Sequence, residues 1–101
     1  MSSISQCEYD IRRYENLKLK IKSILSKLYS AVNNANNFND EIKSKYQVDD
    51  NYTPIVSRTD NLKNDMQATC NYLSNTVLPA INLAIVDLKN EIAILEAEAN
   101  A

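Results

Sequence analysis

The sequence of 101 residues contains no histidine, no tryptophan and no glycine, and it has only two prolines and two cysteines. Glycine-rich phosphate loops need backbone conformations that other residues adopt only at a cost, so this kind of nucleotide site is excluded. Without histidine, the usual proton shuttle and the commonest metal ligand are also missing. A β-rich chain needs turn residues about every ten positions, so the composition favours a helical protein.

Charge is distributed unevenly along the chain. Residues 1–46 hold eight Lys and Arg against five Asp and Glu, a net +3, and residues 47–101 hold three against eight, a net −5. The two halves should attract each other, and neither resembles a basic nucleic-acid-binding arm. No run approaches the roughly 18 apolar residues that span a bilayer. Residues 1–13 lack the apolar segment of a cleavable signal peptide, so we expect a cytoplasmic protein whose export, if any, uses another route.

The first half of the chain has a seven-residue apolar repeat that predicts one long helix over about residues 3–46. Ser3 followed by Gln6 is typical of a capping box at its start. The expected inward positions are Ile4, Cys7, Ile11, Tyr14, Lys18, Ile21, Leu25, Leu28, Val32, Ala35, Asn39, Ile42 and Tyr46. Leu17, Ile24, Ala31 and Phe38 flank this stripe and widen it.

The second half repeats at a mean spacing of 44/12, or 3.67 residues, which predicts a nearly straight helix over about 54–98. Thr53 is the expected N-cap, with Pro54 at the first helical position. The expected inward positions are Ile55, Thr59, Leu62, Met66, Cys70, Leu73, Val77, Ile81, Ala84, Leu88, Ile92, Leu95 and Ala99.

Two helices of equal length joined near residue 50 predict an all-α fold, an antiparallel two-helix hairpin that forms a single domain over 1–101. Residue i should then lie opposite about residue 99 − i. This pairing brings Arg12, Arg13 and Lys18 near Asp87 and Glu91, so we expect ion pairs to help hold the helices together.

Residues 77–86 are apolar almost all round, with only Asn82 polar. A two-helix hairpin buries one stripe of each helix, so this segment favours a second buried face against another helical surface. The alternative is a broad hairpin core that shelters the extra side chains. Pro79 either bends this face around a partner or follows the curvature of a bundle. The expected partner-binding residues are Leu78, Ile81, Leu83, Ile85 and Val86.

Catalytic and metal-binding patterns are missing. Cys7 and Cys70 fall on the apolar stripes and are interpreted as small core residues, too far apart in a hairpin for a disulfide. No Ser or carboxylate occurs in a catalytic or ligand-loop motif, so we expect no enzymatic activity and no cofactor. The Asn-rich stretch 33–39 is open to three interpretations, namely a soft region, a polar layer that sets register, or compositional drift.

A chain of about 100 residues without a signal peptide, built as two equal helices, resembles the WXG100 (ESAT-6-like) superfamily of type VII secretion. The Trp-x-Gly turn of that family is replaced here by Tyr52-Thr53-Pro54, and its Tyr-x-x-x-Asp pattern occurs only as Tyr46 to Asp50, beside the turn. The chain is more similar to the small helical proteins that accompany LXG-type toxins.

This resemblance implies a targeting or chaperone partner that binds the helical N-terminal domain of a secreted toxin. The alternative is a homodimeric coiled-coil adaptor or scaffold with no part in secretion. Nucleic acid and membranes are not expected partners, because the basic residues are scattered around the first helix and the second helix is acidic.

Overall fold

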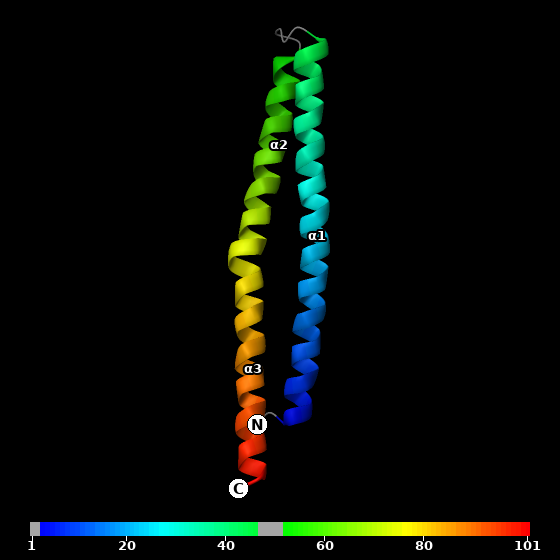
Figure 1. Cartoon of the computed structure of the whole chain (residues 1–101). Helices are drawn as coiled ribbons and strands as arrows, with labels where there is room; N and C mark the ends of the chain where they lie inside the picture. Colours follow the sequence, from blue (N-terminus) through cyan, green and yellow to red (C-terminus); the bar gives the residue numbers. More distant parts are fainter. Residues whose placement is uncertain (1–2, 47–51) are drawn as a thin grey trace. The chain divides into compact units, whose positions relative to one another are not determined.

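The computed structural model describes residues 3–46 and 52–101, which form helices and no strand. Helix α1 spans Ile4–Lys45, and α2 spans Thr53–Tyr72. A short π-helix, η1, spans Leu73–Val77, and α3 spans Leu78–Ala99 (Figure 1). The predicted all-α fold class and both long helices, about 3–46 and about 54–98, are therefore confirmed to within a residue or two at each end.

The two long helices begin differently. At the start of α1 the Gln6 backbone N–H donates a hydrogen bond to Ser3 Oγ over 3.1 Å, as the capping motif predicts. The Gln6 side chain turns away and donates to Asp10 Oδ1, so the reciprocal half of the capping box is absent. At the start of α2 the cap position is held by Tyr52 without a side-chain hydrogen bond, and Thr53 is already helical. The prediction of Thr53 as N-cap was wrong by one residue.

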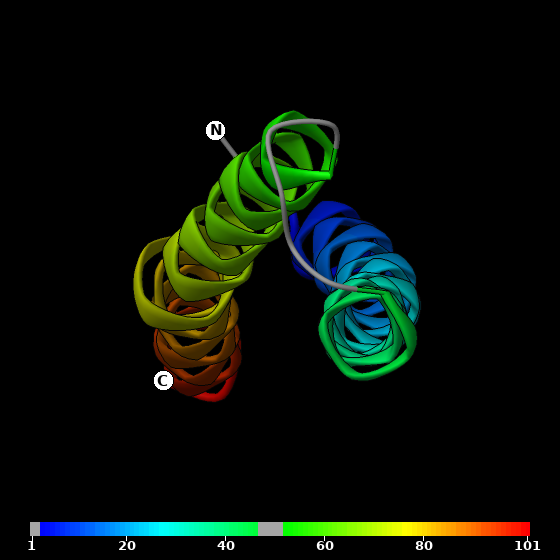
Figure 2. The ribbon, with the colours of Figure 1, turned by 90° about the horizontal axis from the view of Figure 1, so that it is seen from above.

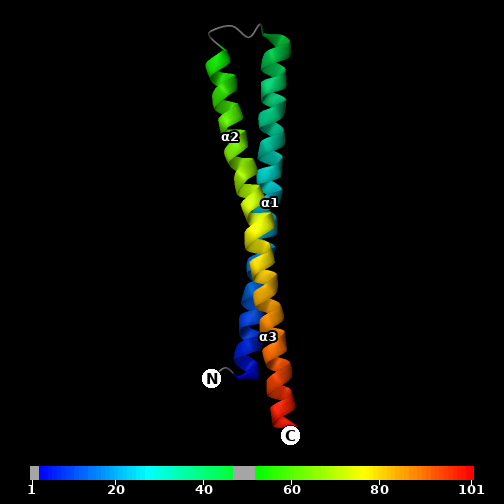
Figure 3. The ribbon, with the colours of Figure 1, turned by 90° about the vertical axis from the view of Figure 1, so that its left-hand side faces the viewer.

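The chain divides into two compact units, each made of two antiparallel helical segments. Unit 1 combines the described part of α1 up to Ser23 with the residues from Ser74 to Ala101. The start of α1 and the end of α3 lie at the same end of this unit (Figure 3). Unit 2 comprises the described residues between Ile24 and Leu73, where the second half of α1 lies beside α2 (Figure 2). Each unit is thus an antiparallel pair of helical segments, as a hairpin of two long helices requires.

The predicted pairing of residue i with about residue 99 − i is confirmed inside both units. In unit 2, Asn39 bonds to Asp60, and Tyr29 lines the same shallow hollow as Cys70. Both pairs sum to 99. Tyr46 and Tyr52, which sum to 98, stack with ring centroids 5.3 Å apart. In unit 1 the Glu91 carboxylate faces the Cys7 thiol, again a sum of 98.

The inward stripe of α1 follows the predicted heptad. Every expected inward position except Tyr46 is buried or half-buried. The buried ones are Cys7, Ile21, Leu25, Val32 and Asn39. The flanking residues Leu17, Ile24 and Phe38 remain more than two-fifths exposed, so the buried stripe is narrower than the apolar one.

The inward stripe of the second helical segment departs from the predicted uniform spacing. Val56 and Cys70 are buried 14 residues apart, which is two heptads, whereas Ile81 follows Cys70 after 11 residues. An eleven-residue step equals a heptad with four residues inserted, a stutter in coiled-coil terms. The mean of 3.67 averaged these two spacings and wrongly placed Ile55 and Leu62 inside. Leu62 is 62% exposed, and the half-buried position is taken by Lys63.

The π-helix lies within the eleven-residue step and ends two residues before Pro79. Proline has no N–H, so the α-helical bond to the Asn75 carbonyl cannot form, and the ring crowds that carbonyl. A π-turn places one extra residue in the loop of each hydrogen bond and so widens the backbone at this point. The irregularity expected at Pro79 is therefore a π-helix that ends two residues before it.

Candidate partner-binding surface

The five residues predicted to bind a partner separate into two groups in the structure. Ile81 and Ile85 are 6% and 7% exposed and belong to the core of unit 1, and Leu78 is half-buried. Leu83 and Val86, in contrast, are 62% and 50% exposed. Ile81 and Ile85 were expected to bind a partner, but both are buried within unit 1, because α1 packs over them.

The exposed side of α3 continues beyond residue 86. Helical positions turn by about 100° per residue, so Leu83, Asn90 and Ile94 come out on the side opposite Ile81. Ile94 is 59% exposed, and every residue on this side is exposed. We name this set the outward stripe, which comprises Pro79, Leu83, Val86, Asn90, Ile94 and Ala97.

The outward stripe repeats with the spacing of a second coiled-coil seam. Its members follow one another at intervals of four, three, four, four and three residues, and only Asn90 is polar. The signal was available in the sequence, but it was hidden because the segment 77–86 was treated as apolar all round. Ile94 and Ala97 were consequently missed as members of this face.

Acidic residues dominate the remaining surface of α3. The helix carries Asp87, Glu91, Glu96 and Glu98 against the single cation Lys89. Among the residues that the structure describes, the only ion pairs are Lys45–Glu41 in α1 and Lys63–Asp60 in α2, and each joins two residues of the same helix. The expected ion pairs from Arg12, Arg13 and Lys18 to Asp87 and Glu91 do not form, so the acidic side chains of α3 have no cationic partner among the described residues of unit 1.

Unit 2 contains a polar cluster at Asn39, which was expected to face inward, and at Lys63, where the apolar Leu62 was expected. Asn39, only 4% exposed, donates from Nδ2 to Asp60 Oδ1 over 2.8 Å. Lys63 Nζ lies 3.7 Å from the same Asp60 oxygen. Asn39 Oδ1 accepts no hydrogen bond from any described residue. Of the three interpretations of stretch 33–39, a buried polar layer therefore applies to Asn39, while Asn33, Asn34 and Asn37 are exposed.

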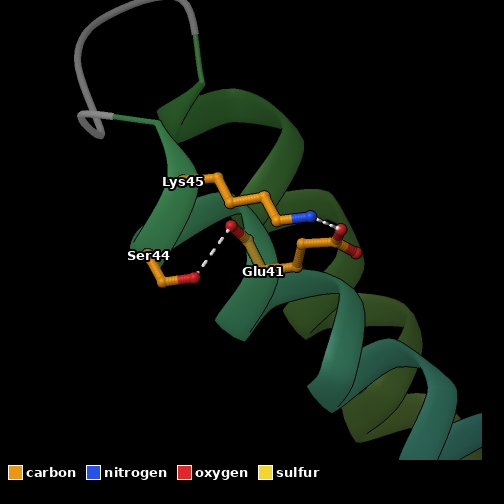
Figure 4. Close-up of polar contacts among 3 residues, drawn as sticks. All are labelled: Glu41, Ser44 and Lys45. Carbon is orange, nitrogen blue, oxygen red and sulfur yellow. Dashed lines mark hydrogen bonds and ion pairs between the residues drawn. The ribbon is translucent and has the colours of Figure 1, made fainter.

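Both thiols are free and buried, which confirms their interpretation as small core residues. Burial raises the pKa of the Cys7 thiol above its usual 9.0, and the Glu91 carboxylate adds to this by repelling the thiolate and by hydrogen bonding. The pKa of Glu41 is lowered by its hydrogen bond and charge attraction to Lys45, 2.6 Å away (Figure 4). This pair is exposed and lies at the end of α1, far in sequence from the outward stripe.

The motif Tyr46 to Asp50 is only partly observable, because Asp50 lies outside the described residues. Tyr46 is exposed and stacks on Tyr52 at the start of α2. None of the described helices is long and apolar enough to cross a membrane. The described residues also contain no cluster of three or more Cys, Asp or Glu that could hold a metal ion.

These features define a class of protein, an all-α helical hairpin with a largely apolar outer face on α3. No protein-family model, curated protein or solved structure matches the chain.

Proposed function

We propose that this chain is a non-enzymatic module that binds another helical protein side by side. The observation that carries the proposal is the set of large apolar side chains left more than half exposed, chief among them Leu19, Leu62, Leu83 and Ile94. A small chain that leaves so much apolar surface in water gains stability and solubility when a partner covers it.

The resemblance to type VII secretion proteins supplies a more specific proposal for the partner. In this proposal the chain pairs in the cytoplasm with the helical N-terminal domain of an LXG-type toxin and acts as its targeting factor or chaperone. Export of the complex then needs no cleavable signal on this chain. The support consists of the two long helices and the apolar surface, both of which suit the assembly of a larger helical bundle.

Co-expression with such a toxin domain tests this proposal. We expect the two chains to co-purify and to elute together at the mass of a complex in light scattering coupled to gel filtration. A neighbouring gene for an LXG-type toxin identifies the domain to use. The secretion proposal fails if the toxin domain does not co-purify, and the broader binding proposal fails if the chain alone is a soluble, stable monomer at high concentration.

A homodimeric adaptor is the alternative that the same measurement detects. A stable dimer of the chain alone, with unchanged mass when the toxin domain is present, would assign the exposed apolar side chains to self-association.

A further inference from the structure

Helix α3 presents two apolar stripes on opposite sides. One is the inward stripe of unit 1, in which Ile81 and Ile85 are buried against α1, and the other is the outward stripe. The Leu83 and Ile94 side chains of the outward stripe are 62% and 59% exposed. A helix with two such stripes is suited to lie between two neighbours, of which α1 is one.

The edges of the outward stripe set the charge of the second neighbour. Asp87 and Glu98 lie closest to the stripe on one side, and Asn82, Lys89 and Ala93 lie on the other, so that two carboxylates and one cation border it. Residues that flank a coiled-coil seam choose the partner by charge, and acidic flanks favour Lys and Arg on the facing helix. Asn90 adds a polar position at the middle of the stripe, which favours a facing residue able to form hydrogen bonds.

We infer that the outward stripe of α3 binds one helix of a partner protein, and that this helix carries an apolar heptad stripe flanked by Lys and Arg with an Asn or Gln facing Asn90. The inference rests on the proposed function, and it adds the face of this chain and the charge of the partner helix.

A second copy of the chain fits the outward stripe less well. Two α3 helices would bring their acidic flanks together, which is unfavourable. The exposed side of α1 in unit 1 is basic, but its stripe of Tyr9, Arg12, Asn16 and Leu19 has charged or polar residues at two of four positions. Arg13 also lies over the Tyr9 ring, 5.8 Å from its centroid, and occupies part of that face.

Two designed helical peptides test the inference with the intact chain. Both have four heptads, Leu at the apolar positions and one central Asn, and they differ only in carrying Lys or Glu at the flanking positions. In fluorescence anisotropy at low salt we expect the Lys peptide to bind at least about tenfold more tightly than the Glu peptide. We expect the difference to shrink in high salt, because screening weakens exposed charge interactions.

Substitutions in the chain locate the binding face. The double variant Leu83→Gln with Ile94→Gln should weaken binding of the Lys peptide by about tenfold or more, since both apolar contacts are lost. The matched control is Ile24→Gln with Ile55→Gln, which removes two exposed isoleucines of unit 2, away from α3, and should change binding by no more than about twofold. Circular dichroism must show that each variant keeps the helicity of the unmodified chain. If the double variant loses helix, the single variant Leu83→Gln is used in its place.

Three results from the peptides and the chain alone overturn the inference. The first is equal binding of the Lys and Glu peptides, and the second is an equal loss in the stripe and control variants. The third is a dimer of the chain that dissociates on Leu83→Gln with Ile94→Gln, which would identify a second copy as the occupant.

If a co-expressed toxin domain binds the stripe variant and the unmodified chain equally, the inference fails while the proposed function stands. If the Lys peptide binds through the stripe and the toxin domain does not bind at all, the secretion proposal fails while the inference about the outward stripe stands.

Discussion

Units 1 and 2 have the same topology but differ in what they bury. Unit 1 buries Ile21, Ile81 and Ile85 together with Cys7, all of them apolar or weakly polar. Unit 2 buries Leu25, Val32, Val56 and Cys70, but it also buries Asn39 and half-buries Lys63. Apolar contacts stabilise a helix pair without fixing one alignment, whereas a buried amide with a single partner penalises every other alignment. The comparison suggests that unit 1 contributes stability and unit 2 contributes register.

The two units also differ in how their exposed apolar residues are arranged. The exposed apolar residues of α3 fall on one regular stripe, whereas Ile55 and Leu62 of α2 stand among charged and polar neighbours. Unit 1 therefore carries the surface on which we propose that a second helix binds, and unit 2 carries the polar contacts that we expect to align the hairpin.

The largest expected effect comes from the core of unit 1. Ile85→Ala should lower the free energy of unfolding by about 2–4 kcal/mol, because it removes buried methyl groups and leaves a cavity. The adjacent and exposed Val86→Ala should change it by less than about 0.5 kcal/mol. Urea denaturation followed by circular dichroism measures both, and similar losses for the two variants would contradict the assignment of the inward and outward sides of α3.

Smaller effects on the free energy of unfolding are expected at Asn39 in unit 2, and their sign depends on the residue that replaces it. Asn39→Ala should cost about 1–2 kcal/mol through the lost hydrogen bond and the space left behind. Asn39→Leu should instead raise the free energy of unfolding by about 1 kcal/mol, since an apolar residue suits the site and Asp60 can be hydrated.

Register is the property that Asn39→Leu should lose. We expect this variant to show more than one species in light scattering, or mixed cross-links between introduced cysteines at positions 36 and 63 and at neighbouring positions. One uniform species with a single cross-link would show that the Asn39–Asp60 bond does not select the alignment.

The smallest expected effect is a dependence on alkaline pH in unit 1. The pKa of Cys7 is raised in the folded chain above its usual 9.0, so the unfolded chain releases this proton first as the pH rises. The associated stability is complete below pH 9.0 and is lost as the pH rises through the higher folded pKa. Urea midpoints at about pH 8 and pH 10 should therefore fall more for the unmodified chain than for Cys7→Ala.

Glu91→Gln separates the causes of that dependence. Removing the carboxylate should reduce the fall in the urea midpoint without abolishing it, because burial is the larger contribution to the raised pKa. If the urea midpoint falls equally in the unmodified chain, Cys7→Ala and Glu91→Gln, the sensitivity to alkaline pH belongs to other groups.

The heptad of α1 could be predicted position by position, because its apolar residues recur at intervals of seven from Cys7 to Val32 and helix geometry places them on one side. The same argument failed at Ile55 and Leu62, where apolar character pointed inward and the structure buries or half-buries Val56 and Lys63 instead. The Asn39–Asp60 bond and the Lys63–Asp60 pair occupy that part of the interface. A pattern of hydrophobicity cannot anticipate them, because it assigns no favourable energy to a polar residue inside.

The order of residues by itself determined that this chain is helical, where its two long helices begin and end, and which residues face each other across the pairing that sums to about 99. These follow from local propensity, from periodicity and from the equal lengths of the two arms. Only the tertiary structure decided which side of α3 is covered and which is free. Residues 77–86 present apolar side chains on almost every side of the helix, and a single neighbouring helix can bury only one stripe of them. The packing of α1 therefore decided that Ile85 is buried and Leu83 is exposed.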